Sequence, residues 1–149
     1  MIEWARGDLF EADVDALVNA VNTAGVMGKG IALAFKQRFP DYFAAYAAAC
    51  ARGEVQIGRV RAWAHPAGRP AWILDVPTKR HWRSRSRLDE VAAGIDALVE
   101  ALRARSIASV AVPALGCGLG GLAWADVRPH LERAFARAPE IRALVFAPA

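Results

Sequence analysis

The chain has 149 residues, of which 55% are hydrophobic and 23% charged, and its formal net charge is +4. This length suits one domain with one core, and the composition excludes an intrinsically disordered chain. No apolar run approaches the roughly 20 residues of a membrane span, and the N-terminal segment lacks the layout of a secretory signal. Cys50 and Cys117 match no metal or redox spacing, so we expect free thiols and a cytoplasmic protein.

Apolar runs of strand length alternate with helical stretches along the chain. In chain order, we expect a short edge strand, a buried strand, two helices, two strands, a long helix, a buried strand, a helix and a strand that closes the sheet. The predicted strands cover 2–6, 16–21, 59–64, 71–76, 109–113 and 141–146. The predicted helices cover 30–39, 41–53, 88–102 and 124–138. This alternation predicts an α/β three-layer sandwich around a mixed β-sheet.

Local signals set some of these boundaries. Pro40 ends the first helix, and Asp41 is expected to cap the second. A turn at 65–68 separates the third and fourth strands, since it contains proline and glycine. We find no repeat and no low-complexity linker, so the chain reads as a single domain over 1–149.

Two glycine-rich loops follow predicted buried strands. Residues 22–30 read Asn-Thr-Ala-Gly-Val-Met-Gly-Lys-Gly, and residues 115–121 read Leu-Gly-Cys-Gly-Leu-Gly-Gly. Glycines let a backbone approach a ligand closely, and a helix N-terminus offers unpaired N–H groups to a phosphate. Each loop alone could be no more than a tight turn. Together, at the carboxyl ends of strands, they predict a site that clamps a diphosphate. Neither fits a dinucleotide fingerprint or a Walker loop.

These motifs resemble the macrodomain family over essentially the whole chain. The similarity rests on Gly7-Asp8-Leu9 and on residues 15–22, 25–30 and 113–118. A narrower resemblance, carried by residues 25–32 and 77–82, is to DarG-type macrodomains. It implies a DNA ADP-ribosyl glycohydrolase that removes ADP-ribose from thymidine in single-stranded DNA and acts as an antitoxin to a DarT-type toxin. Such proteins usually continue into a toxin-binding region, which we expect this chain to lack.

The resemblance also implies which residues bind ADP-ribose. Asp8 would accept a hydrogen bond from the adenine amino group, unless it is only a turn or cap residue. Asn22 would face the distal ribose, whereas Asn19 would brace the loop. Lys29 could be no more than a solvated charge. The full set of implied ligand-binding residues is Asp8, Leu9, Asn22, Gly28, Lys29, Gly30, Ile31, Gly116, Cys117, Gly118 and Leu119.

Lys79 is the candidate catalytic residue. It follows an apolar strand, where burial lowers the pKa of a lysine and exposes a nucleophilic amine. The resemblance implies that it acts on the glycosidic bond at C1 of the distal ribose. It could add to C1 and form a Schiff-base-type adduct, or assist ring opening without a covalent step. The alternative is that Lys79 only contacts a phosphate.

The sequence departs from a protein-directed cousin of the family at one position. That cousin carries a catalytic aspartate where this chain has Gly120, and the next acid is Asp126. The missing acid favours a DNA-directed enzyme over one that deacylates glutamate. Proton delivery to the thymine then has no obvious donor; His81 is a candidate, although a contact to the DNA backbone suits it better.

A basic segment with one tryptophan follows the candidate lysine. Residues 79–87 hold five Lys or Arg residues and no acid. Arginines bind phosphates, and a tryptophan can stack on an unpaired base. Because chemistry on a base needs it outside the duplex, these residues predict a single-stranded DNA interface, although a solvated charged face is the alternative. The predicted DNA-binding residues are Arg80, His81, Trp82, Arg83 and Arg85.

Two other classes of function stay open at this stage. One is a hydrolase of ADP-ribosylated acidic side chains or of O-acyl-ADP-ribose; the other is a non-catalytic ADP-ribose reader. His65, His81 and His130 are scattered without ligand spacing, so we expect no metal, and no motif calls for a cofactor.

Overall fold

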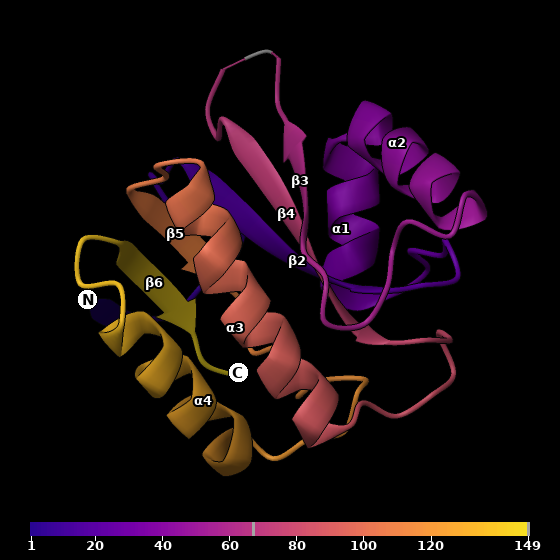
Figure 1. The fold of residues 1–149 in the computed structure, drawn as a ribbon. Coiled ribbons are helices and arrows are strands. Elements are labelled where there is room, and N and C mark those ends of the chain that lie inside the picture. The colour runs from indigo at the N-terminus through magenta and orange to yellow at the C-terminus, as the bar shows by residue number, and fades with distance from the viewer. Residues whose placement is uncertain (67, 149) are drawn as a thin grey trace.

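The computed structural model describes residues 1–66 and 68–148 and contains one six-stranded mixed sheet (Figure 1). The strands are β1 (Ile2–Ala5), β2 (Ala16–Asn22), β3 (Arg61–Ala64), β4 (Trp72–Lys79), β5 (Ser109–Val112) and β6 (Arg142–Phe146), in the spatial order β1-β6-β5-β2-β4-β3. All neighbouring pairs are parallel except β3 and β4.

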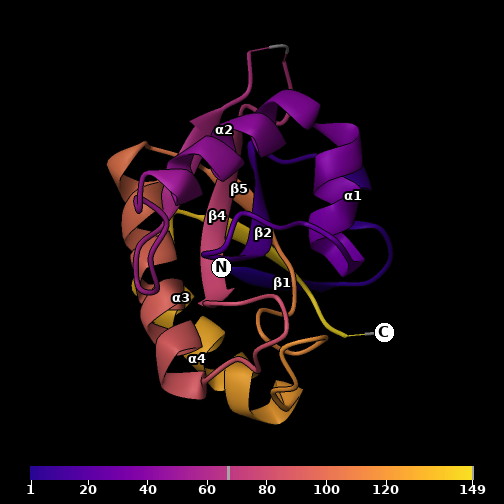
Figure 2. The ribbon, with the colours of Figure 1, turned by 90° about the vertical axis from the view of Figure 1, so that its right-hand side faces the viewer.

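Helices cover both faces of this sheet. The helices α1 (Gly30–Arg38) and α2 (Pro40–Ala51) lie on one face, and α3 (Leu88–Ala104) and α4 (Trp124–Ala136) lie on the other (Figures 1 and 2). A short 3₁₀ helix, η1 (Leu9–Glu11), connects β1 to β2. Each face has its own buried hydrophobic cluster, one formed with α3 and α4 and one with α1 and α2. The predicted three-layer α/β sandwich with a mixed sheet is therefore confirmed.

Some predicted boundaries are wrong, and the largest error concerns β4. This strand does not end at Val76 but continues through Pro77 to Lys79. A proline inside a central strand removes a ladder hydrogen bond, and here it stands beside an irregularity that interrupts the pairing of β2 with β4. The second helix begins at Pro40, with Asp41 inside its first turn, since proline suits the first helical position.

The remaining differences are smaller. The strand β3 starts at Arg61 rather than at 59, and β6, the last strand in the chain, lies between β1 and β5. The predicted edge position of β1 is confirmed. The predicted turn at 65–68 includes residue 67, which lies outside the described residues.

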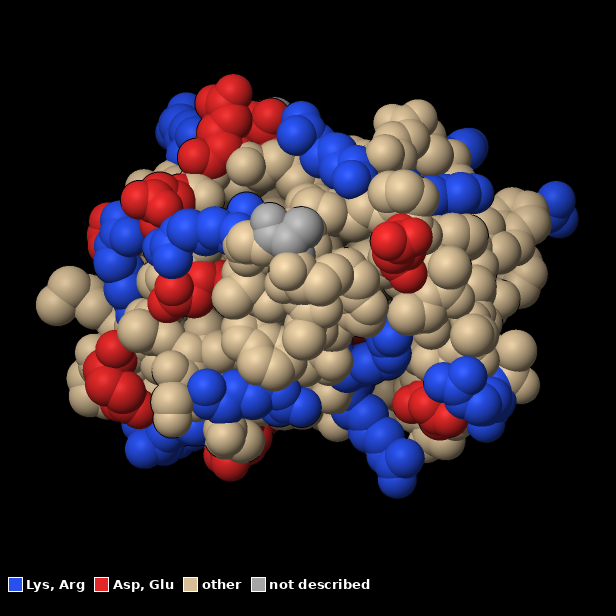
Figure 3. All heavy atoms as spheres, turned by 90° about the horizontal axis from the view of Figure 1, so that it is seen from above, with Lys and Arg blue, Asp and Glu red and all other residues tan. Residues whose placement is uncertain are grey.

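The sheet brings its functional strand ends together at one end of the molecule. Because β2, β4, β5 and β6 run parallel, their carboxyl ends lie at the same edge of the sheet. The opposite end, seen in Figure 3, presents intermixed acidic and basic side chains.

A charged residue is buried under α2. Asp75 in β4 is fully buried, and Tyr42 donates a hydrogen bond to its Oδ1. Nη1 of Arg61 lies 3.0 Å from the other carboxylate oxygen. Burial raises the pKa of Asp75 from its ordinary 3.8 to about 6, although the Tyr42 hydrogen bond and the Arg61 charge oppose the rise.

This raised pKa predicts a pH-dependent stability. The folded protein binds the Asp75 proton more tightly than the unfolded chain does. Protonated Asp75 therefore adds to the free energy of unfolding; this contribution is complete below about pH 4 and is lost as the pH rises through 6. Relative to Asp75→Asn, the native free energy of unfolding should fall by about 2–3 kcal/mol between pH 4 and 7. Urea denaturation of both proteins measures this difference, and a difference that does not change with pH would contradict the prediction.

Candidate functional site: a cleft at the strand ends

A cleft of about 1230 Å³ lies at the carboxyl ends of the parallel strands. Both glycine-rich loops, the end of β4, the start of η1 and the segment after β6 contribute to its walls. The sequence-predicted residues that line it are Asp8, Leu9, Asn22, Gly28, Lys29, Gly30, Ile31, Lys79, Trp82, Arg83, Gly116, Gly118 and Leu119. Most of the residues proposed from the sequence thus meet in one cavity.

The first loop is held by Asn22. Its side-chain Oδ1 accepts N–H bonds from Ala24 at 3.0 Å and Val26 at 3.4 Å, and its Nδ2 donates to the Val26 carbonyl at 2.8 Å. Gly25 supplies a left-handed turn with φ of +86°. Asn22 therefore both shapes the loop and lines the cleft. Asn19 contacts Met27 from the interior, as the bracing role predicts.

The loop ends at the N-terminus of α1. Lys29 is the N-cap residue and makes no side-chain capping bond. The first intrahelical bond runs from Leu33 N–H to the Lys29 carbonyl at 3.2 Å, so the earlier N–H groups of the helix have no helical partner. Because Gly30 and Ile31 line the cleft, this end of the helix offers a partial positive charge to an anionic ligand.

The second loop turns tightly and reaches across the cleft. Gly116 has φ of +76°, and its carbonyl accepts the N–H of Leu122 at 2.9 Å. The side chain of Leu119 is 64% exposed, and an ideal Cβ at Gly30 would lie only 3.8 Å from its Cδ1. The two loops therefore approach each other over the cleft, as a diphosphate clamp requires.

Cys117 is the one predicted ligand-binding residue outside the cleft lining. Its backbone N–H donates to the Ala114 carbonyl at 3.1 Å, and its thiol lies 3.7 Å from the Leu115 carbonyl. Burial raises the pKa of this thiol. The turn thus engages the Cys117 N–H group, and the side chain packs against the core rather than facing the cleft.

The packing around Gly120 accounts for the missing aspartate. An ideal Cβ at this position would lie 2.3 Å from Oγ of Ser86 and 2.6 Å from the Gly116 carbonyl oxygen. The backbone N–H of Ser86 also donates to the Gly120 carbonyl at 2.9 Å. Ser86 therefore occupies the space that any side chain at position 120 would need, and a carboxylate there would displace the loop.

Lys79 lies at the cleft wall beside Asn22. The two residues are register partners at the ends of β4 and β2, just after the irregularity in pairing. The Lys79 ammonium donates to the Trp82 carbonyl at 3.0 Å. The side chain is half-buried, and desolvation lowers the pKa of its amine. This pKa direction is the one that favours a reactive amine.

Asp8 combines a structural role with a place in the cleft. Its Oδ1 accepts the Phe10 N–H at 2.9 Å and caps η1, and its Oδ2 lies 3.6 Å from Arg38. The cap that the sequence analysis offered as an alternative is therefore present. A carboxylate accepts more than one hydrogen bond, and Asp8 also lines the cleft, so its carboxylate can still accept a hydrogen bond there.

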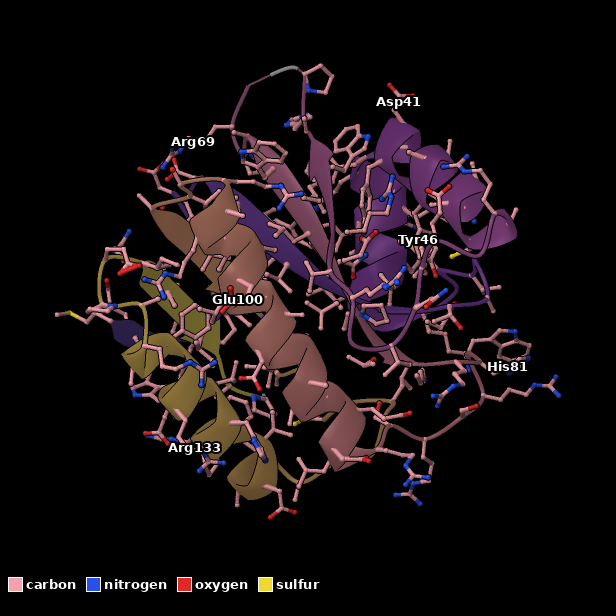
Figure 4. All side chains as sticks on the ribbon, viewed as in Figure 1. Asp41, Tyr46, Arg69, His81, Glu100 and Arg133 are labelled. Atoms are coloured by element: carbon pink, nitrogen blue, oxygen red, sulfur yellow. The ribbon has the colours of Figure 1, made fainter. Side chains whose placement is uncertain are left out.

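The predicted DNA-binding residues divide into two groups. Trp82 and Arg83 line the cleft, and the Arg83 guanidinium lies 4.3 Å from the centre of the Trp82 ring, which also stacks with His81. Arg80, His81 and Arg85 do not line it. Arg80 is paired with Glu90 at 2.6 Å, so its charge is partly neutralised. His81 lies at the periphery (Figure 4).

Sequence reasoning missed several cleft residues. Phe10, Thr78 and Gly120 adjoin predicted positions, and simple extension of the motifs would have included them. Phe146, the last residue of β6, also lines the cleft, together with Ala147 and Pro148, which follow that strand. The parallel pairing of β6 with β5 carries this segment to the same edge of the sheet. The sequence predicted the strand itself but not its direction in the sheet.

The chain belongs to the macrodomain family. The family description "Macro domain" matches residues 18–131, which include the first glycine-rich loop, Lys79 and the second loop. Within the described residues, 1–66 and 68–148, no group of three or more His, Cys, Asp or Glu side chains is placed to hold a metal ion. In the same part of the chain, no helix has the length and apolar character to cross a membrane.

The chain is similar to DarG-type macrodomains in particular. The DNA ADP-ribosyl glycohydrolase of Mycobacterium tuberculosis is 49% identical over 151 residues, which cover 99% of this chain and 42% of that protein. The Thermus aquaticus protein of the same name is 45% identical and is covered to 41%. The chain therefore spans less than half the length of these relatives.

Solved structures show the same relationship. The macrodomain of Mycobacterium tuberculosis DarG superposes with a TM-score of 0.97, covering 100% of this chain and 99% of that one. Thermosipho africanus DarTG in complex with ADP-ribose is 35% identical with a TM-score of 0.93, covering 99% of this chain and 41% of that one. These matches confirm the resemblance stated from the sequence.

The packing around Gly120 predicts a selective sensitivity to side chains. Gly120→Ala should lower the free energy of unfolding by about 1–3 kcal/mol, because the new methyl group collides with Ser86 and the Gly116 carbonyl. Gly118→Ala is the matched control, since nothing lies within 4 Å of its ideal Cβ. Thermal and urea unfolding measure both variants; equal stability of the two would show that the space at Gly120 is not filled.

Proposed function

We propose that the cleft binds ADP-ribose with its diphosphate between the two glycine-rich loops. The open N-terminus of α1 and the loop at 116–121 supply backbone groups on opposite sides. Asp8 would then meet the adenine, and Asn22 the distal ribose. The complex of Thermosipho africanus DarTG with ADP-ribose supports this assignment, because that protein has the same fold at 35% identity.

The chain acts, in this proposal, as a DNA ADP-ribosyl glycohydrolase. The observation that carries it is the position of Lys79, a half-buried residue that lines the cleft and is the strand partner of Asn22. A reader of ADP-ribose has no need of such an amine. The relatives that are 45–49% identical over nearly the whole chain carry this activity in their names.

Lys79 is the proposed catalytic residue. The reaction breaks the bond between C1 of the distal ribose and the thymine base, and water supplies the new hydroxyl at C1. A lysine whose pKa is lowered by burial has a larger neutral fraction at neutral pH, so its lone pair is available at the anomeric carbon. The covalent route needs the amine at that carbon, whereas assisted ring opening needs it at the ribose hydroxyls.

Single-stranded DNA carrying ADP-ribose on thymidine is the proposed substrate. Arg83 lines the cleft, and Arg85 lies against Gly121, whose ideal Cβ would be 2.7 Å from its Nη2. Neither guanidinium has a carboxylate partner within residues 1–66 and 68–148. Both are therefore available to DNA phosphates, whereas Arg80 contributes less because Glu90 holds it.

The filled space at Gly120 supports DNA over acyl-linked protein substrates, since the loop has no room for an acidic side chain.

We further propose an antitoxin role opposite a DarT-type toxin, in line with the fused transferase and glycohydrolase named for Thermosipho africanus. The chain would supply the single macrodomain of that system. Two free cysteines suit the reducing cytoplasm.

Removing the Lys79 amine should abolish turnover without preventing binding. Lys79→Ala is expected to release ADP-ribose from a thymidine-modified single-stranded oligonucleotide at least about a hundredfold more slowly than the native chain. Its affinity for free ADP-ribose, measured by calorimetry, should change by less than about threefold. A variant that still turns over at the native rate would leave only a binding module.

Reversing two charges at the rim should affect DNA and not the nucleotide. The double variant Arg83→Glu with Arg85→Glu is expected to raise KM for the modified oligonucleotide by about tenfold or more, and to flatten its salt dependence, because two phosphate contacts are lost. The control is Arg105→Glu with Arg133→Glu, which makes the same change in net charge away from the cleft. Arg105 follows the end of α3 and Arg133 lies in α4. Equal loss of free ADP-ribose binding in the rim variant would refute the DNA interface.

A further inference from the structure

The hydroxyl of Tyr46 reaches the first glycine-rich loop from behind the cleft. Tyr46 extends from α2 toward the sheet (Figure 4) and is fully buried. Its O–H lies 2.7 Å from the Asn22 carbonyl oxygen and 2.9 Å from the side-chain Oδ1 of Asn22. Burial raises the pKa of this phenol, so the hydroxyl stays protonated and continues to donate.

These contacts fix which end of the Asn22 amide is the oxygen. Oδ1 accepts the N–H groups of Ala24 and Val26, and the Tyr46 hydroxyl shares its one hydrogen between Oδ1 and the Asn22 carbonyl oxygen. Nδ2 faces one acceptor, the Val26 carbonyl at 2.8 Å. The reversed amide would place its NH₂ against the two backbone N–H donors and its oxygen against a carbonyl, and both contacts are repulsive.

The amide therefore presents a donor to the cleft. Nδ2 carries two hydrogens, and within the described residues, 1–66 and 68–148, only the Val26 carbonyl accepts one of them. Asn22 lines the cleft and is 6% exposed, so the second N–H is available to a ligand oxygen. Tyr46 itself does not line the cleft.

We propose that Tyr46 is a positioning residue for the distal ribose: it locks the Asn22 amide so that an N–H group, not the carbonyl, binds a ribose hydroxyl oxygen. This inference rests on the proposed ADP-ribose function. It assigns to α2 a part in recognition, although that helix contributes no residue to the cleft lining.

A neighbouring tyrosine supplies the matched control. Tyr42 stands one turn earlier in α2 and is equally buried, but its hydroxyl contacts Asp75 and Asn19, which do not line the cleft. Loss of either hydroxyl leaves a polar group unpaired in the interior, so both Tyr→Phe variants should have lower melting temperatures. Only Tyr46→Phe should alter recognition of the distal ribose.

The test compares ADP-ribose with ADP, which lacks that ribose, by calorimetric titration. For Tyr46→Phe, affinity for ADP-ribose should fall about five- to tenfold while affinity for ADP changes less than about twofold. For Tyr42→Phe, both affinities should stay within about twofold of native. In an Asn22→Ala background, Tyr46→Phe should no longer change the ratio of the two affinities.

The outcomes separate this inference from the function beneath it. An equal fall for both ligands, or no fall for either, would overturn the positioning role of Tyr46. A native chain that binds ADP-ribose no more tightly than ADP would overturn the proposed function itself. If Tyr46→Phe does not fold, Asn22→Asp tests the same geometry, because a carboxylate would replace the donor; an ADP-ribose affinity equal to native would then overturn the inference.

Discussion

The pairing of Asn22 with Lys79 at the ends of two parallel strands is the contact on which the rest of the site depends. One irregularity between Val21 and Asn22 shifts the register, so that Asn22 stands opposite Lys79 rather than Thr78. Both residues line the cleft, so neighbouring strand ends contribute an amide and a lysine to its wall. In the proposed complex, a distal ribose bound at the amide would bring its anomeric carbon toward Lys79.

Each glycine-rich loop is supported from the side away from the ligand. Behind the first, α2 places the Tyr46 hydroxyl on Asn22. Behind the second, Ser86 bonds to Gly120 and fills the space beside it. Lys79 is the last residue of β4, and Ser86 lies in the connection from β4 to α3, so one short segment links the reactive amine to the support of the second loop. Preorganisation of this kind keeps the loops open to a ligand without collapse.

The sequence alone predicted the layers and about half of the residues that line the cleft, because hydrophobic periodicity and glycine-rich strand ends are local signals. It failed where partners come from elsewhere in the chain. The ion pair of Arg80 with Glu90 joins a loop to α3. The Cys117 N–H donates within a turn whose shape no motif specifies. Because proline disfavours strands, Pro77 led to a predicted strand end that is three residues too early. The place of Phe146 in the cleft wall depends on the order of strands in the sheet, which hydrophobic patterns do not predict.

The proposed reaction requires the anomeric carbon of bound ADP-ribose to lie beside Lys79. The most direct measurement is a crystal structure of the native chain with ADP-ribose, in which the distance from Lys79 Nζ to that carbon is read. We expect about 3–4 Å, with the amine withdrawn from the Trp82 carbonyl that it contacts in the free protein. A distal ribose placed at the Phe146 end of the cleft, with Nζ still on Trp82, would contradict the account.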